Sequence, residues 1–378
     1  RQAPPLASVP VENSGSSHAQ ARGSLPNSRP PPGCHGPAGP QDGLCPYLLC
    51  RPECMGIPDN REGRPAHRRK GEETRPASRE GGSQMTAEKF DVYTHVTNQI
   101  IAQIEAGTPP WRKPWTGSGA SVSLPERFNG ESYRGINILM LWATAMSKGY
   151  SSARWMTFNQ AKELGGHVRK GEKSATVVKY GTVEREDENG EERQIPYAKA
   201  YRVFNADQIE GLPAEFYILP DPPRDLGTVA DPALEAFFAA SGAQIDVTEE
   251  PRAYYNIKTD RIHMPPIATF HRAAGYYGTL AHELTHWTGA AKRLDRLGRF
   301  NDRKAYAFEE LVAEIGNCML CAQIGVEPEF DQSAAYVEGW LAAMKEDSRA
   351  IFRAASEAQK AVDYIMERTA RADQMAAE

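Results

Sequence analysis

The residues best suited to chemistry are His282, Glu283 and His286, which form an H-E-x-x-H pattern within residues 280–287. On a helix, residues four apart lie on one face, so the two histidines point the same way, one turn apart. Two imidazoles in this relation can bind one metal ion, and Glu283 lies where it can polarise a metal-bound water. The spacing predicts a catalytic metal site. The alternative is an amphipathic helix with incidental charges.

A catalytic zinc site uses three protein ligands and keeps a fourth position for water, so another ligand must come from elsewhere. Residues 306–316 have helical periodicity and carry Glu310 and Glu314 four apart in a mostly apolar segment. Carboxylates there are costly to bury unless they are paired or bind metal. We predict Glu310 as the third ligand and Glu314 as the group that holds a ligand histidine through its other ring nitrogen. Glu309 and Glu314 are the alternatives for the ligand itself.

With these ligands in place, Glu283 is the expected general base that acts on the metal-bound water, and the metal also polarises the scissile carbonyl. Zinc is the expected ion, with another divalent metal as the alternative. A predicted hairpin at 253–264 precedes the helix and offers a strand edge to peptide-like substrates. Phosphoester hydrolysis is a weaker hypothesis, because it usually uses paired metals with more carboxylates.

Composition divides the chain before any motif is considered. Residues 1–84 are rich in Pro, Gly, Ser and Arg and have no apolar periodicity, so we expect a disordered leader upstream of a natural start at Met85. Residues 85–212 mix helical stretches with two hairpin strands. A proline-dense linker is expected at 213–229, followed by a domain at 230–370 that contains the H-E-x-x-H helix. The predicted fold class is α+β, with a small N-terminal α+β domain and a mainly helical C-terminal domain.

Aromatic and cationic side chains are interleaved in the first of these domains. Aromatic faces stack on bases and cations follow phosphates, which suits single-stranded nucleic acid without sequence readout. The alternative is that the tryptophans belong to the core and the cations form a solvated face. Prolines favour exposure of the cluster at 111–115, because they hold it out of regular structure. The candidate DNA-binding residues are Trp111, Arg112, Lys113, Trp115, Tyr133, Arg134, Trp155, Arg169, Lys170 and Lys173.

Net charge and cysteine placement set broader limits. The formal charge of −5 indicates no global affinity for nucleic acid, so the distribution of charge matters more. No apolar run approaches the roughly 18–20 residues that span a bilayer, which predicts no membrane partner. The 6 cysteines are too unevenly placed for a disulfide framework, so we expect a cytoplasmic, reducing location.

Residues 85–368 resemble the ArdC-type antirestriction proteins of conjugative plasmids and related mobile elements. The likeness lies in Trp-Arg-Lys-Pro-Trp at 111–115, Tyr-Arg-Gly-Ile-Asn at 133–137, Trp-Met-Thr-Phe-Asn-Gln-Ala at 155–161, and the blocks at 165–173, 203–209 and 282–289. The resemblance implies an N-terminal single-stranded-DNA-binding domain, shared with some plasmid-encoded primases, and a C-terminal zincin-like metallopeptidase domain. It also implies delivery with incoming DNA, or protection of that DNA against host restriction.

Two functional hypotheses follow from the residues and the resemblance together. In the first, the chain binds single-stranded DNA and hydrolyses peptide bonds of an unidentified protein substrate through a metal-activated water. In the second, it is a non-catalytic protein that shields incoming single-stranded DNA, and its zinc site is structural or vestigial.

Overall fold

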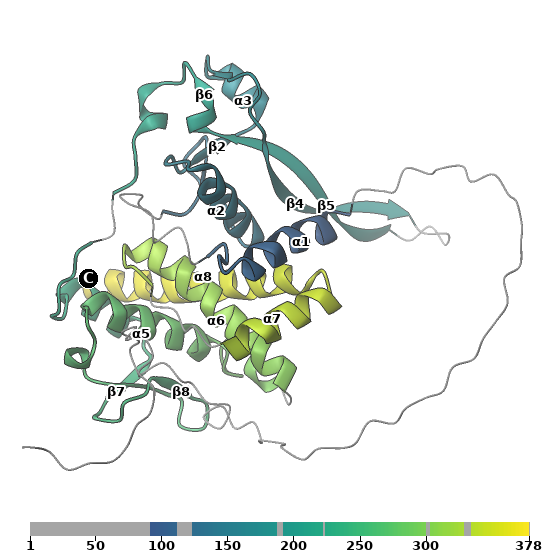
Figure 1. The fold of residues 1–378 in the computed structure, drawn as a ribbon. Helices are drawn as coiled ribbons and strands as arrows, with labels where there is room; N and C mark the ends of the chain where they lie inside the picture. The colour runs from purple at the N-terminus through teal and green to yellow at the C-terminus, as the bar shows by residue number, and fades with distance from the viewer. Residues whose placement is uncertain are drawn as a thin grey trace, which may run out of the picture. The chain divides into compact units, whose positions relative to one another are not determined.

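The structure is a computed structural model that describes residues 91–111, 123–186, 192–221, 224–299, 303–328 and 334–377. The expected leader at 1–84 lies outside these residues, as do Arg112, Lys113 and Trp115. Helices and strands are mixed throughout the described ranges (Figure 1), which confirms the predicted α+β class.

The N-terminal half is built on a long hairpin. β4 and β5 pair antiparallel from Ala175↔Val203 to Glu186↔Glu192, which confirms the predicted hairpin and extends it toward the turn. They form one side of a sheet with the order β1-β2-β5-β4, and β3 pairs separately with β6. The elements are α1 (Val92–Glu105), β1 (Glu126–Arg127), α2 (Ile136–Lys148), β2 (Arg154–Met156), α3 (Phe158–Glu163), β3 (His167–Val168), β4 (Ala175–Glu186), β5 (Glu192–Asn205) and β6 (Ile209–Glu210).

The C-terminal half is mainly helical, as predicted. Its small sheet has the order β7-β9-β8, so that β8 is an edge strand and pairs antiparallel with β9. The elements are α4 (Pro232–Ala240), β7 (Gln244–Val247), β8 (Tyr254–Asn256), β9 (Arg261–Met264), α5 (Ala273–Thr288), α6 (Arg303–Ile324), α7 (Ala334–Glu346) and α8 (Ala350–Ala377). The domain boundaries predicted near 212 and 230 stay predictions.

Helix α8 packs against helices of both halves of the chain. It packs against α4, α5 and α6 and also contacts α2 (Figure 1). An apolar stripe, with Ala354, Ala358, Val362 and Ile365 fully buried, accounts for this position. The opposite face carries charged residues and is exposed, as its strong amphipathic pattern requires. Of the helices in the described ranges, none combines the length and apolar character needed to span a bilayer.

Candidate metal centre and basic groove

The H-E-x-x-H residues lie on α5, as the sequence predicts. Every residue of this helix is buried except His282, whose side chain is 14% exposed. Helix α6 comes close to α5 where Gly316 meets Thr285, since a Cβ at Gly316 would lie 2.6 Å from Thr285 Cγ2. This close approach brings the acidic residues of α6 to the histidines. The partly open His282 leaves one side of the cluster accessible from outside.

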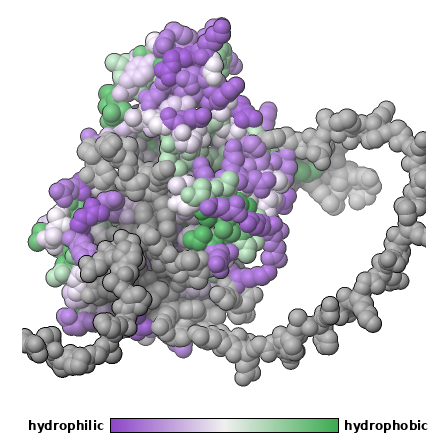
Figure 2. Space-filling model, viewed as in Figure 1, coloured by the Kyte–Doolittle hydropathy of each residue, from purple (hydrophilic) through white to green (hydrophobic). Residues whose placement is uncertain are grey.

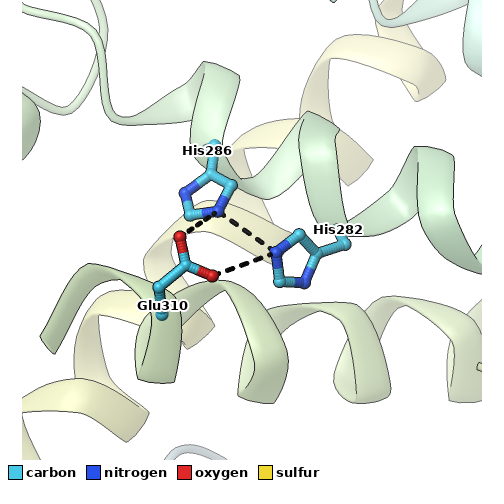
Figure 3. A group of neighbouring side chains, drawn as sticks. All are labelled: His282, His286 and Glu310. Carbon is cyan, nitrogen blue, oxygen red and sulfur yellow. Dashed lines mark hydrogen bonds and ion pairs between the residues drawn. The ribbon is translucent and has the colours of Figure 1, made fainter. Parts of the chain in front are cut away.

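His282, His286 and Glu310 converge on one point (Figure 3), and their ligand atoms lie within 4.8 Å of one another. The Nε2 atoms of His282 and His286 are 3.2 Å apart. Glu310 Oε2 lies 3.6 Å from the Nε2 atom of His282, and Glu310 Oε1 lies 3.6 Å from the Nε2 atom of His286. Glu310 Oε1 and Glu283 Oε2 are buried and have no hydrogen-bond partner. A divalent cation fits this donor set, because two imidazoles and one carboxylate are the ligands of many catalytic zinc sites. The geometry therefore brings together the three predicted ligands.

The charges around the cluster favour a cation. Burial raises the pKa of Glu283. Burial opposes the charge on His282, yet its polar contact with Glu310 and the nearby charges of Glu283, Glu310 and Glu314 raise its pKa to about 9. For Glu310, the charge of His286 and the contact with His282 outweigh burial, so its pKa is lowered. Several carboxylates thus surround two imidazoles in a site that favours positive charge.

His286 is held from behind by Glu309. Its Nδ1 lies 3.2 Å from Glu309 Oε1, on the ring side away from the cluster. Arg296 donates to both oxygens of Glu309, at 2.9 and 3.1 Å, and both side chains are at most 2% exposed. Arg296 also donates to Thr288 Oγ1 at 2.9 Å. Sequence reasoning considered Glu309 only as an alternative ligand and missed Arg296, which lies in the loop after α5 and belongs to no periodic pattern.

Glu314 lies near the other histidine of the cluster, His282. Its Oε2 lies 4.0 Å from His282 Nδ1, which is an ion-pair distance and longer than a hydrogen bond. Glu309 and His286 instead make the carboxylate–histidine contact expected behind a metal ligand. The role predicted for Glu314, to hold a ligand histidine through its other ring nitrogen, stays a prediction.

Edge strand β8 lies beside the cluster. α5 contacts both β8 and β9, and the backbone N–H of Tyr255 on β8 donates to the carboxylate of Glu283. Tyr255 itself is fully buried. An extended peptide added along this strand would lie next to Glu283, and the substrate position predicted from the hairpin stays a prediction.

A basic groove lies between the β4–β5 hairpin, the start of α2 and one face of α8, and encloses about 1010 Å³. It is also lined by aromatic side chains, among them Tyr93, Tyr133, Tyr180 and Tyr201. In the view of Figure 2, hydrophilic residues predominate among the described residues, and hydrophobic residues form smaller patches between them. Six cationic residues and one acidic residue line the groove: Arg127, Arg134, Lys179, Arg349, Arg353 and Lys360, with Asp363 as the acid.

The structure separates the DNA-binding candidates. Tyr133 and Arg134 line the groove. Trp111 and Trp155 do not bind bases by stacking in this fold, because they are at most 1% exposed. Trp111 packs edge-on against Trp340 of α7, with ring centroids 6.0 Å apart, so for both indoles the core alternative holds. Three further candidates are exposed but do not line the groove, namely Arg169, Lys170 and Lys173.

Two known protein families match separate parts of the chain. Residues 90–204 match the family described as the N-terminal domain of anti-restriction factor ArdC, and residues 232–357 match the zincin-like metallopeptidase family. The chain is 66% identical to the crystallised, metal-free antirestriction ArdC protein from plasmid R388, with a TM-score of 0.69, over 75% of this chain and 99% of that one. The chain belongs to the ArdC-type antirestriction protein family.

One further structure and two further proteins are similar to this chain. The Mn(II)-bound structure of the R388 ArdC protein is 65% identical, with a TM-score of 0.66, over 74% of this chain and 99% of that one. A Sinorhizobium fredii protein, y4eC, is 39% identical over 73% of this chain and 91% of its own length. The DNA primase TraC of Escherichia coli is 37% identical over 75% of this chain but only 28% of its own length. The shared segment is thus a small part of that primase.

Proposed function

We propose that this ArdC-type protein is a metal-dependent peptidase, with His282, His286 and Glu310 as the ligands and Glu283 as the general base. The observation that carries the proposal is the convergence of the three ligand atoms within 4.8 Å beside a buried, unpartnered Glu283 oxygen. The neighbouring edge strand supplies a place for an extended peptide. The protein substrate is proposed to be one that lies near the incoming DNA.

The chemistry is divided between the metal and the chain. A bound divalent ion would polarise the scissile carbonyl and lower the pKa of a coordinated water. Glu283 takes the proton of the attacking water and returns it to the leaving amine. Burial raises the pKa of Glu283, which suits a group that must both accept and release a proton near neutral pH. Tyr255 N–H, which donates to Glu283, keeps the carboxylate oriented.

Zinc is the proposed ion, because two histidines and one glutamate form a common zinc-hydrolase ligand set. The Mn(II)-bound relative supports a site that also accepts another divalent metal. The peptidase proposal is tested by comparing peptide hydrolysis by the metal-loaded wild-type chain and by its Glu283→Gln variant. Absence of hydrolysis by the metal-loaded wild-type chain would support the non-catalytic hypothesis instead.

A second function is proposed for the basic groove: binding of single-stranded DNA. The supporting observation is that aromatic faces and cations line the same groove, the combination that holds single strands without sequence readout. Tyr180 lies on β4, lines the groove and is 50% exposed, so a base can reach its ring. Lys179 also lines the groove. Arg127 lies over the ring of Tyr133, 5.6 Å from the centroid, and this cationic–aromatic pair also lines the groove.

We expect the wild-type protein to bind a fluorescein-labelled oligothymidylate more tightly than a duplex of equal length, as measured by anisotropy. The logarithm of the binding constant should fall with the logarithm of salt concentration, by about 0.7 for each phosphate neutralised. Lys179→Gln should reduce that slope by about 0.7, because it removes one contact. Lys162→Gln is the matched control, since Lys162 is an exposed cation on α3 outside the groove. Salt-insensitive binding, or none, would remove the second function.

A further inference from the structure

One wall of the basic groove is formed by helix α8, which belongs to the C-terminal half of the chain, where the proposed peptidase site lies. The groove-lining residues of α8 include Phe352, Ser356, Gln359 and Asp363. Their spacing of three or four places them on one face of the helix, over about 16 Å at 1.5 Å per residue. The same face carries the cations Arg353 and Lys360. On this face Arg353, Ser356 and Lys360 are exposed, whereas Phe352 and Gln359 are buried. The face is distinct from the apolar stripe that packs on α5 and α6.

We propose that this face of α8 is a DNA-binding surface, so that a single DNA strand is held jointly by the N-terminal half and by the last helix of the peptidase half. The inference rests on the proposed binding of single-stranded DNA and assigns half of the phosphate contacts to a helix outside the ArdC N-terminal family match, which ends at residue 204. Three of the six groove cations belong to this wall, namely Arg353 and Lys360 on α8 and Arg349, the residue just before the helix.

The cations of α8 are available for phosphate. Arg353 pairs with Asp347 at 2.6 Å and Lys360 with Glu357 at 2.7 Å, and both cationic side chains are at least 55% exposed. Exposed ion pairs of this kind contribute about 0–1 kcal/mol, so a phosphate can replace the carboxylate at little cost. Phosphate also keeps the hydrogen bonds charge-assisted.

Asp363 opposes the proposed ligand. It forms an ion pair with Arg134, the groove cation at the start of α2, and is the acidic residue among those that line the groove. Gln359, one turn earlier, accepts the backbone N–H of Gly135 at 2.9 Å. The two contacts tie α8 to the start of α2 when no DNA is bound. A DNA phosphate would compete with Asp363 for Arg134, so Asp363 weakens binding of the strand.

The experiment measures oligothymidylate binding by anisotropy, as a function of salt, for the full-length chain. Arg353→Gln with Lys360→Gln should flatten the slope by about 1.4, which weakens binding about 25-fold at 0.1 M salt if affinities converge near 1 M. Asp363→Asn should bind more tightly than wild type, with a slope about 0.7 steeper, because Arg134 becomes free for a phosphate. A misfolded variant would not gain affinity, so this second variant protects the test against loss of folding.

The matched control is Arg371→Gln with Lys345→Gln, which removes two exposed cations on α8 and α7 outside the groove and should bind as wild type. If the α8 double variant and Asp363→Asn both bind as wild type while Lys179→Gln weakens binding, DNA binding is retained by the N-terminal half and the role of α8 is wrong. If the wild-type protein does not bind the oligonucleotide at all, the proposed function itself fails.

Discussion

The Glu283→Gln variant is expected to hydrolyse peptides about 10²–10⁴-fold more slowly than wild type, the range that general acid–base catalysis supplies. Glutamine keeps the shape of the side chain and can still accept the Tyr255 N–H, but it cannot take a proton from water. Since Glu283 is not among the three converging ligands, the variant should keep its full metal content. Loss of activity with metal retained therefore separates proton transfer from metal binding.

The measurement is the rate of cleavage of a quenched fluorescent peptide library by metal-loaded wild type and variant at equal metal content. His263→Gln is a suitable control, because His263 lies on β9, bonds Thr248 at 3.0 Å and is not one of the three converging ligands. It should cleave as wild type does. A Glu283→Gln protein that retains wild-type activity would assign the base to another residue.

Glu309→Gln is expected to destabilise the protein by about 3–5 kcal/mol, because it leaves the buried guanidinium of Arg296 without its counter-charge. Both side chains are at most 2% exposed, so water cannot replace the lost charge. The variant also loses the carboxylate behind His286, which should weaken metal binding about 10–100-fold. The loss of stability is thus caused by the unpaired charge of Arg296. The weaker metal binding is caused by the missing carboxylate behind His286.

Urea unfolding of the metal-free protein measures the first effect, and metal titration measures the second. Glu346→Gln is the matched control: its side chain is 66% exposed and pairs with Lys304, so its effect should stay within about 0.5 kcal/mol. Adding Arg296→Met to Glu309→Gln should restore part of the stability, because no unpaired charge remains buried. Equal stability of Glu309→Gln and wild type would show that the pair does not hold this loop to α6.

The group of candidate metal ligands could be predicted from the sequence because two local rules apply to it. Helical spacing places His282 and His286 on one face, and a carboxylate such as Glu310 on an apolar helix needs a partner. The same rules cannot rank Glu309 against Glu310, because adjacent helical residues differ only in direction and the direction depends on how α6 packs on α5. Gly316 permits that packing, and its importance becomes visible only when Thr285 lies against it.

The DNA-binding candidates were harder to predict, because exposure is decided by distant parts of the chain. Trp111 is covered by Trp340, which belongs to a helix far along the sequence. Local pattern favoured exposure, since the prolines around 111–115 discourage regular structure. Conversely, Tyr180 and Lys179 read as ordinary strand residues until α8 supplies the opposite wall of the groove. The apolar stripe of α8 is visible in the sequence, but its polar face carries no comparable signal.

The most direct test of the proposed metal-ligand set compares the metal content of the purified wild-type protein with that of three variants, His282→Ala, Glu310→Ala and Glu314→Ala. We expect about one equivalent of divalent metal in wild type, since three ligands hold one ion. We also expect near-complete loss in His282→Ala and Glu310→Ala, and retention in Glu314→Ala, whose carboxylate is 4.0 Å from the outer nitrogen of His282. Full metal in Glu310→Ala together with loss in Glu314→Ala would contradict the proposed ligand set.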